Sequence, residues 1–269
     1  DSSIDSSIDS SIDSLMDSSI DHLVSQINDI AVAAGQEILD IYQRDFKVDM
    51  KDDNSPVTEA DVAANDIIVA SLRTITPDIP ILSEEGSSIP WDERKHWQTF
   101  WLVDPLDGTK EFIKRNGEFT VNIALIHNQQ PILGVVYAPV LDKLYYTTTQ
   151  GAFLLHAGET TQLSALAIPD DEPVKVVGSR SHASPEMALY LARYKDTDII
   201  PVGSSLKFCL IAEGSAHCYP RLGPTCWWDT GAGHAVACAA GAKVVQLDGS
   251  PLLYNHQESV LNPFFVVAK

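Results

Sequence analysis

The chain has 269 residues, of which 45% are hydrophobic and 20% charged, and its formal net charge is −19. This length suits one large domain or two fused halves with a substantial core. The sequence has no run of about 18 apolar residues, so we expect no transmembrane segment. A protein that binds a nucleic-acid polymer would need a basic face, and this acidic chain is therefore not expected to bind one.

Residues 1–21 repeat a four-residue unit and read DSSIDSSIDSSIDSLMDSSID. Isoleucines four residues apart are compatible with a weak helix face. A repeat this polar cannot build a core by itself. We therefore expect residues 1–21 to form a flexible low-complexity tail.

Residues 22–158 are predicted to form two helices followed by an antiparallel sheet. Apolar residues from Leu23 onward keep a helical period. Thr58 and Asp61 have the spacing of a capping box, which predicts a second helix that ends near Ile75. Short β-rich runs separated by turn residues follow. The expected strands lie at residues 79–83, 100–103, 119–126, 132–137, 144–148 and 151–155.

Residues 159–269 alternate predicted strands and helices, a pattern typical of an α/β unit. The boundary is placed near residue 158, where the sequence is polar and turn-like. The expected strands lie at residues 174–177, 199–202, 243–246 and 264–267, and the expected helices at residues 185–194, 205–213 and 230–240.

Acidic residues stand at the ends of predicted elements. Glu84 follows one strand, Asp104 and Asp107 follow another, and Asp229 directly precedes a helix. Active sites commonly lie in such loops, and hard divalent cations prefer oxygen ligands. A helix that starts after Gly108 would offer free N–H groups to a phosphate. Taken alone, these short spacings are explained more simply by turns and helix caps.

Two longer motifs are more specific. Residues 104–109 read DPLDGT and residues 228–233 read WDTGAG. They resemble the two signatures of the lithium-sensitive, Mg²⁺-dependent phosphatases of the inositol monophosphatase superfamily. Long runs, including residues 101–126 and 203–210, are most similar to the bacterial 3′(2′),5′-bisphosphate nucleotidases of sulfate assimilation. The resemblance covers residues 22–269.

The resemblance implies an α/β fold built as a layered α/β/α/β/α sandwich. It also implies Mg²⁺-dependent hydrolysis of the 3′-phosphate of adenosine 3′,5′-bisphosphate to AMP and phosphate, with water as the nucleophile. The sulfated precursor, 3′-phosphoadenosine 5′-phosphosulfate, stays open as a second substrate. We expect a cytoplasmic protein, and peripheral association with the cytoplasmic side of the inner membrane stays open.

The resemblance also implies a ligand set for two Mg²⁺ ions. Glu84, Asp104 and the backbone carbonyl of Leu106 would hold one ion. Asp104, Asp107 and Asp229 would hold the second. Two metals about 4 Å apart can stabilise both the entering and the leaving oxygen of an in-line displacement. Such close carboxylates are tolerable because the cations offset their repulsion.

The remaining implied roles concern catalysis and substrate binding. Asp61 and Thr109 would orient the attacking water, so the catalytic set is Asp61, Glu84 and Thr109. A third, weaker metal at Asp61 stays open, and Glu85 would support the metal ligands. The implied substrate contacts are Gly108, Thr109 and Lys110 at the scissile phosphate and His182, Ser205, Lys207 and Arg221 at the nucleotide and its other phosphate.

Two other functions stay open. An inositol phosphate or sugar phosphate phosphatase would share the metal residues, whereas residues 107–112 and 203–208 favour the nucleotidase. A non-catalytic sensor of Mg²⁺ or nucleotide is the second alternative. The presence of Asp61, Glu84 and Thr109 argues against a loss of catalysis.

Overall fold

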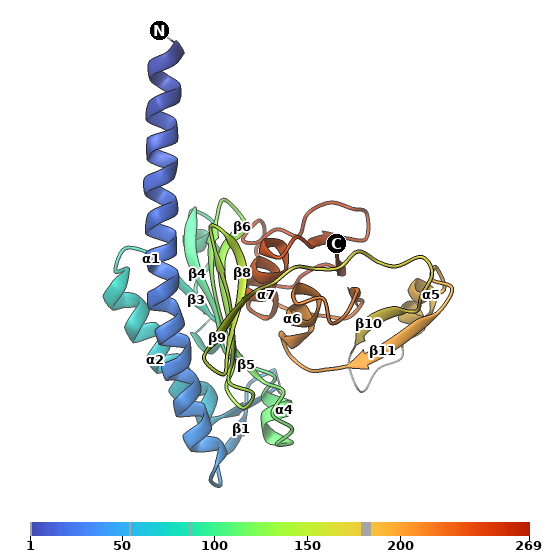
Figure 1. Cartoon of the computed structure of the whole chain (residues 1–269). Helices are drawn as coiled ribbons and strands as arrows, with labels where there is room; N and C mark the ends of the chain where they lie inside the picture. The colour runs from blue at the N-terminus through green and yellow to red at the C-terminus, as the bar shows by residue number, and fades with distance from the viewer. Residues whose placement is uncertain (1, 54, 87, 179–183) are drawn as a thin grey trace.

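The structure, a computed structural model, describes residues 2–53, 55–86, 88–178 and 184–269, with side chains from residue 19 onward (Figure 1). Its helical elements are α1 (Ser2–Tyr42), α2 (Glu59–Ile75), the 3₁₀ turn η1 (Glu84–Gly86), α3 (Trp91–Arg94), α4 (Thr109–Ile113), α5 (Pro185–Leu191), α6 (Leu206–Ala212) and α7 (Trp227–Ala239). Its strands are β1 (Val48–Met50), β2 (Pro56–Thr58), β3 (Ile81–Ser83), β4 (Thr99–Asp107), β5 (Thr120–His127), β6 (Gln130–Ala138), β7 (Lys143–Thr148), β8 (Gly151–His156), β9 (Glu159–Gln162), β10 (Val174–Gly178), β11 (Thr197–Pro201), β12 (Cys218–Arg221), β13 (Lys243–Gln246) and β14 (Phe265–Ala268).

These elements form five layers. Helices α1 and α2 cover one face of a seven-stranded sheet with the order β3-β4-β5-β6-β7-β8-β9 (Figure 1). Helices α6 and α7 lie between this sheet and a five-stranded sheet with the order β11-β10-β12-β14-β13. Tyrosines of the α5 region pack on the other face of the second sheet. The α/β/α/β/α sandwich implied by the sequence is confirmed.

Strand β4 lies between the two main cores. Trp101 and Val103 pack into the core shared with α1 and α2, whereas Phe100 and Leu102 pack into the core shared with α7. This alternation follows from the two-residue period of a strand. The register with β5 shifts between Asp104 and Asp107, as at a β-bulge. The DPLDGT motif therefore ends β4 at the centre of the sandwich.

The observed start of α2 agrees with the sequence prediction, whereas the observed start of α7 does not. The capping box of α2 is confirmed, with Thr58 as N-cap and Asp61 as its third residue. Helix α7 begins at Trp227, three residues before the predicted start, because the two tryptophans at its beginning are buried in the core. The prediction that Asp229 precedes this helix is wrong: it is the third helical residue and accepts a hydrogen bond from the N–H of Cys226 at 2.8 Å.

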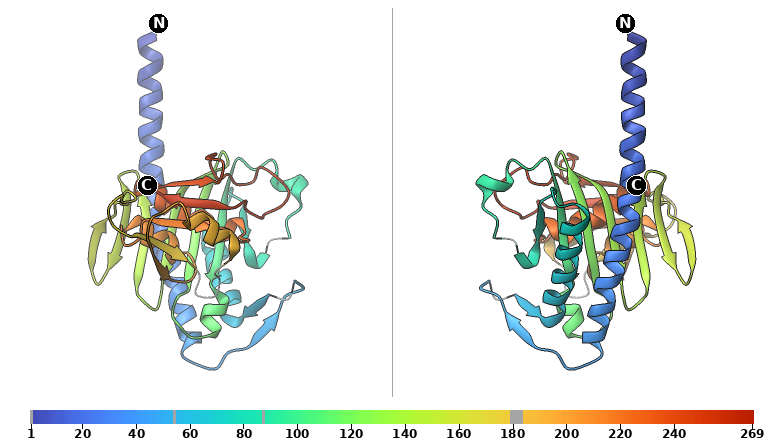
Figure 2. Two further views of the ribbon diagram at one scale, coloured as in Figure 1. Left: turned by 90° about the vertical axis from the view of Figure 1, so that its right-hand side faces the viewer. Right: turned by 90° about the vertical axis from the view of Figure 1, so that its left-hand side faces the viewer.

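Residues 2–21, for which a flexible tail was expected, form the start of helix α1. The start of α1 extends beyond the body of the sandwich in all three views (Figures 1 and 2). The chain has no glycine or proline before Gly35, so no residue in this stretch strongly opposes a helix. At the end of the repeat, Asp21 accepts hydrogen bonds from the N–H and Oγ1 of Thr149, at 2.9 and 2.8 Å.

The boundary expected near residue 158 falls inside the β8–β9 hairpin, where His156 pairs with Glu159. The first sheet ends at Gln162 and the second begins at Val174, so a division between the sheets lies later than predicted. Within the described residues, no helix has both the length and the apolar character needed to cross a bilayer. The expected location and the peripheral membrane association stay predictions.

Candidate active site

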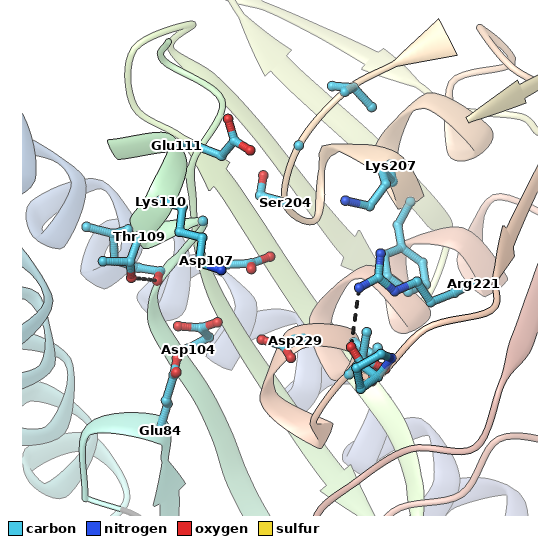
Figure 3. A pocket seen from close by; sticks show the side chains of 18 of the residues that line it. Glu84, Asp104, Asp107, Thr109, Lys110, Glu111, Ser204, Lys207, Arg221 and Asp229 are labelled. Atoms are coloured by element: carbon cyan, nitrogen blue, oxygen red, sulfur yellow. Dashed lines mark hydrogen bonds between the residues drawn. The ribbon is translucent and has the colours of Figure 1, made fainter. Parts of the chain in front are cut away.

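A cavity of about 370 Å³ opens where the end of β4 meets α4, the loop before α6 and the first turn of α7. Carboxylates lie along one wall, and a lysine and an arginine face them across the cavity (Figure 3). The residues expected from the sequence that line it are Glu84, Asp104, Leu106, Asp107, Gly108, Thr109, Lys110, Lys207, Arg221 and Asp229.

Three of the carboxylates converge closely enough to hold one cation. Oxygen atoms of Glu84, Asp104 and Asp229 lie within 4.8 Å of one another (Figure 3). Asp104 is buried, and its Oδ1 has no hydrogen-bond partner among the described residues. Oxygen ligands gathered around a buried carboxylate suit a hard divalent cation. The donor set therefore fits the metal that the sequence implied.

The raised pKa values of these carboxylates also favour a bound cation. Burial raises the pKa of Asp104 well above its usual range, and the charges of Glu84, Asp107 and Asp229 raise it further. Burial also raises the pKa of Asp229 to about 7, with the charge of Asp107 adding to the effect. Like charges brought together in a buried site are costly without a counter-ion. A bound cation would remove this cost.

Asp107 lines the same cavity but lies outside the group of three. Its Oδ2 accepts hydrogen bonds from Ser205 Oγ at 2.6 Å and from Asn122 Nδ2 at 3.2 Å. Ser205, expected to contact the nucleotide, does not line the cavity, since its side chain is buried and directed toward Asp107. Ser204 lines the cavity instead, and its buried Oγ has no partner among the described residues.

Asp61 and Thr109 form the pair expected beside the metal ligands. Thr109 Oγ1 donates to Asp61 Oδ1 at 2.8 Å and lies 3.5 Å from the carbonyl oxygen of Leu106. Asp61 Oδ2 accepts from the N–H of Thr58 at 2.9 Å and from its Oγ1 at 2.6 Å. Asp61 therefore both caps α2 and fixes the Thr109 hydroxyl at the cavity wall.

Two cations occupy the opposite wall. Lys207 is buried, which lowers its pKa, while the charge of Asp107 acts in the opposite direction. Arg221 donates through Nη2 to the carbonyl oxygen of Pro224 at 3.2 Å, and its buried Nε has no partner among the described residues. Both side chains face the cavity (Figure 3).

Other expected residues lie around this centre. Glu85 pairs with Lys51 at 2.8 Å, and the same ammonium lies 3.6 Å from Glu84 Oε1. Lys51 belongs to none of the sequence motifs, and its place in the polar loop before α2 is its only signal in the sequence. His182, expected near the nucleotide, lies outside the described residues.

The comparisons with known proteins decide the family. The model of the inositol monophosphatase family matches residues 20–264. This chain belongs to the inositol monophosphatase family. The resemblance drawn from the two sequence motifs is thereby confirmed.

Relatives within the family share most of the chain. The 3′(2′),5′-bisphosphate nucleotidase CysQ of Escherichia coli O6:H1 is 53% identical over 248 residues, which cover 91% of this chain and 99% of that protein. The protein of the same name from Haemophilus influenzae is 35% identical, with 91% and 92% covered. The crystal structure of CysQ from Bacteroides thetaiotaomicron superposes with a TM-score of 0.81 at 43% identity, covering 92% of this chain and 97% of that one.

Proposed function

We propose that this protein is a Mg²⁺-dependent 3′(2′),5′-bisphosphate nucleotidase, which hydrolyses the 3′-phosphate of adenosine 3′,5′-bisphosphate to give AMP and phosphate. The observation that carries the proposal is a single cavity with converging carboxylates on one wall and Lys207 and Arg221 on the other. The 53% identity to a nucleotidase of this name supports the choice of substrate.

We assign the metal ligands as the sequence implied. Glu84, Asp104 and the carbonyl oxygen of Leu106 would hold one Mg²⁺, and Asp104, Asp107 and Asp229 a second. When bound, Mg²⁺ neutralises phosphate charge, lowers the pKa of a water molecule and stabilises the leaving oxygen. The proposal does not include a third ion at Asp61.

Both oxygens of Asp61 accept hydrogen bonds from threonine side chains. We assign Asp61, together with Thr109, to the activation of the attacking water. Thr109 Oγ1 accepts a proton from water as its own proton passes to Asp61 Oδ1, so that the pair acts as a general base. Gly108 and Lys110 line the cavity beside Thr109 and would contact the scissile phosphate.

The opposite wall would hold the phosphate that is not hydrolysed. Arg221 offers a planar fork of donors, Lys207 a point charge, and Ser204 a hydroxyl. An inositol monophosphate has no second phosphate to use these donors, which is why the site favours a bisphosphate. The sulfated precursor carries negative charge at the same end of the nucleotide and stays within the proposal as a second substrate.

Phosphate release from purified protein tests the proposal. Adenosine 3′,5′-bisphosphate, 3′-phosphoadenosine 5′-phosphosulfate and inositol 1-phosphate are compared in Mg²⁺ and in EDTA, and the nucleotide product is identified by chromatography. We expect kcat/KM for the bisphosphate to exceed that for inositol 1-phosphate by at least about 10-fold, the worth of one charge-assisted hydrogen bond. A preference for inositol 1-phosphate would support the sugar phosphatase instead, and nucleotide binding without turnover would support the sensor.

A further inference from the structure

A chain of buried hydrogen bonds holds Asp107 through residues that do not line the cavity. Thr120 Oγ1 donates to Asn122 Oδ1 at 2.9 Å. Asn122 Nδ2 donates to Ser205 Oγ at 2.7 Å and to Asp107 Oδ2 at 3.2 Å. Ser205 Oγ lies 2.6 Å from Asp107 Oδ2 and 3.1 Å from the carbonyl oxygen of Asp229. The side chains of residues 120, 122 and 205 are all buried.

The proton positions in this chain follow from the donor inventory. The carboxylate of Asp107 can only accept, so the Asn122 amide must present its NH₂ group to it. Ser205 has a single hydroxyl proton, and the shorter of its two contacts places that proton on Asp107. Oδ2 of Asp107 is thus held by two donors at once. Rotation of this carboxylate is restricted, and Oδ1 becomes its oxygen for a ligand in the cavity.

The members of the chain come from several parts of the fold. Asn122 lies on β5, paired in register with Asp104 on β4, and Asp107 ends the same strand. Ser205 is the residue before α6, and Asp229 lies in the first turn of α7. The Ser205 hydroxyl therefore joins the start of α6 to the end of β4 and lies against the first turn of α7, where the proposed metal ligands converge.

We propose that Ser205 and Asn122 are positioning residues that set the affinity of the site for divalent cations. They orient Asp107, and Ser205 also lies against the backbone of Asp229. The inference rests on the proposed metal-binding role of the cavity. Hydrogen-bond partners that orient a metal ligand typically change metal affinity 10- to 100-fold when they are removed.

Calorimetric titration of Mg²⁺ into the substrate-free protein tests this inference without an activity assay. The variants are Ser205→Ala, Asn122→Ala and the combination of both. We expect Kd for Mg²⁺ to rise by about 10-fold or more in each single variant. Because both donors act on the same oxygen, the double variant should lose less than the product of the two single losses.

Thr147→Val supplies the matched control. Thr147 is also a buried hydroxyl residue of the first sheet, and its Oγ1 accepts from the N–H of Gly134 at 3.1 Å, away from the cavity. This variant should lose thermal stability yet bind Mg²⁺ within about twofold of wild type, since it leaves the metal ligands untouched. A tenfold loss of Mg²⁺ affinity in Thr147→Val would show that general destabilisation explains the effect and would overturn the inference.

A second measurement separates positioning from substrate contact. At Mg²⁺ concentrations that saturate each variant, KM for adenosine 3′,5′-bisphosphate should stay near the wild-type value. Wild-type Mg²⁺ affinity in Ser205→Ala, with or without a raised KM, would overturn the inference. If Ser205→Ala does not fold, Asn122→Ala decides by the same criterion. Absence of Mg²⁺ binding in the wild type would instead contradict the proposed function itself.

Discussion

Thr109 Oγ1 donates to Asp61 Oδ1 at 2.8 Å, while Oδ2 of the same carboxylate caps helix α2 through Thr58. The short spacing of Thr58 and Asp61 indicates only a capping box, whereas the family resemblance implies a catalytic role for Asp61. The structure shows the cap and the contact with Thr109 together. The start of α2 is therefore tied directly to the wall of the cavity.

The hydroxyl of Thr109 should be essential for turnover. Thr109→Val keeps the shape of the side chain but removes the group that passes a proton to Asp61. We expect kcat for adenosine 3′,5′-bisphosphate to fall by about 10²- to 10⁴-fold, the usual contribution of a positioned acid–base group. Thr109→Ser keeps the hydroxyl and should retain most of the activity. Equal kcat values in the two variants would contradict the assigned role.

Asp104→Asn should change stability in opposite directions with and without metal. In EDTA the substitution removes a buried charge from a group of carboxylates, so Tm should rise by about 2–6 °C. In Mg²⁺ the wild type should gain stability by binding the ion, whereas the variant should gain little and should lack turnover. Thermal unfolding in both solutions checks this. A Mg²⁺-induced increase in Tm equal to that of the wild type would rule out Asp104 as a ligand.

The sequence predicts those site residues that belong to short, continuous motifs. The strings that end β4 and begin α7 place Asp104, Asp107 and Asp229 near one cavity. Sequence spacing does not tell which of two adjacent serines faces the cavity, because this depends on where α6 begins. Here Ser204 lines the cavity and Ser205 is buried behind it.

Long-range partners and exposed strands are harder to predict. Asn122 donates a hydrogen bond to Ser205, which lies 83 residues later in the sequence, and no local pattern connects the two. All four residues of β9 are exposed, so the alternation of apolar residues that reveals a strand is missing there. The boundary expected near residue 158 consequently lies inside the β8–β9 hairpin. The start of α7 was misplaced because the burial of the two tryptophans in its first turn is set by tertiary packing.

Burial of His234 should make stability depend on pH. Burial lowers the pKa of His234 to about 3, and its Nδ1 lies 3.0 Å from the hydroxyl of Tyr254. An unfolded histidine binds a proton below about pH 6.5, whereas this one stays neutral, so stability is full above that pH and is lost as pH falls. Between pH 7 and 5 the loss from this group is about 2 kcal/mol.

Urea unfolding of wild type and His234→Gln at pH 7 and pH 5 measures this contribution. The variant should show a smaller decrease in the free energy of unfolding, by about 2 kcal/mol, since all other titrating groups are shared. Parallel decreases in the two proteins would show that His234 accepts a proton in the folded state.

The N-terminal repeat should be dispensable for catalysis. No described residue before Ser55 lines the cavity. Deletions of residues 1–18 and 1–21 should both keep kcat/KM within about threefold of the full chain. Only the longer deletion removes Asp21 and its two hydrogen bonds to Thr149, so it should have a Tm about 2 °C below that of the shorter one. A hundredfold loss of kcat/KM would show that the repeat supports the active site.

The most direct test of the account concerns the second phosphate. Arg221→Ala is assayed on adenosine 3′,5′-bisphosphate and on adenosine 3′-monophosphate, which carries the same hydrolysable group. Arg193→Ala is the control, because Arg193 stacks 3.5 Å from the centre of the Tyr190 ring, outside the cavity. We predict that Arg221→Ala lowers kcat/KM for the bisphosphate by about 10- to 100-fold and for the monophosphate far less, while Arg193→Ala changes neither. Equal losses on both substrates in Arg221→Ala would contradict the assignment of this cavity to a bisphosphate nucleotide.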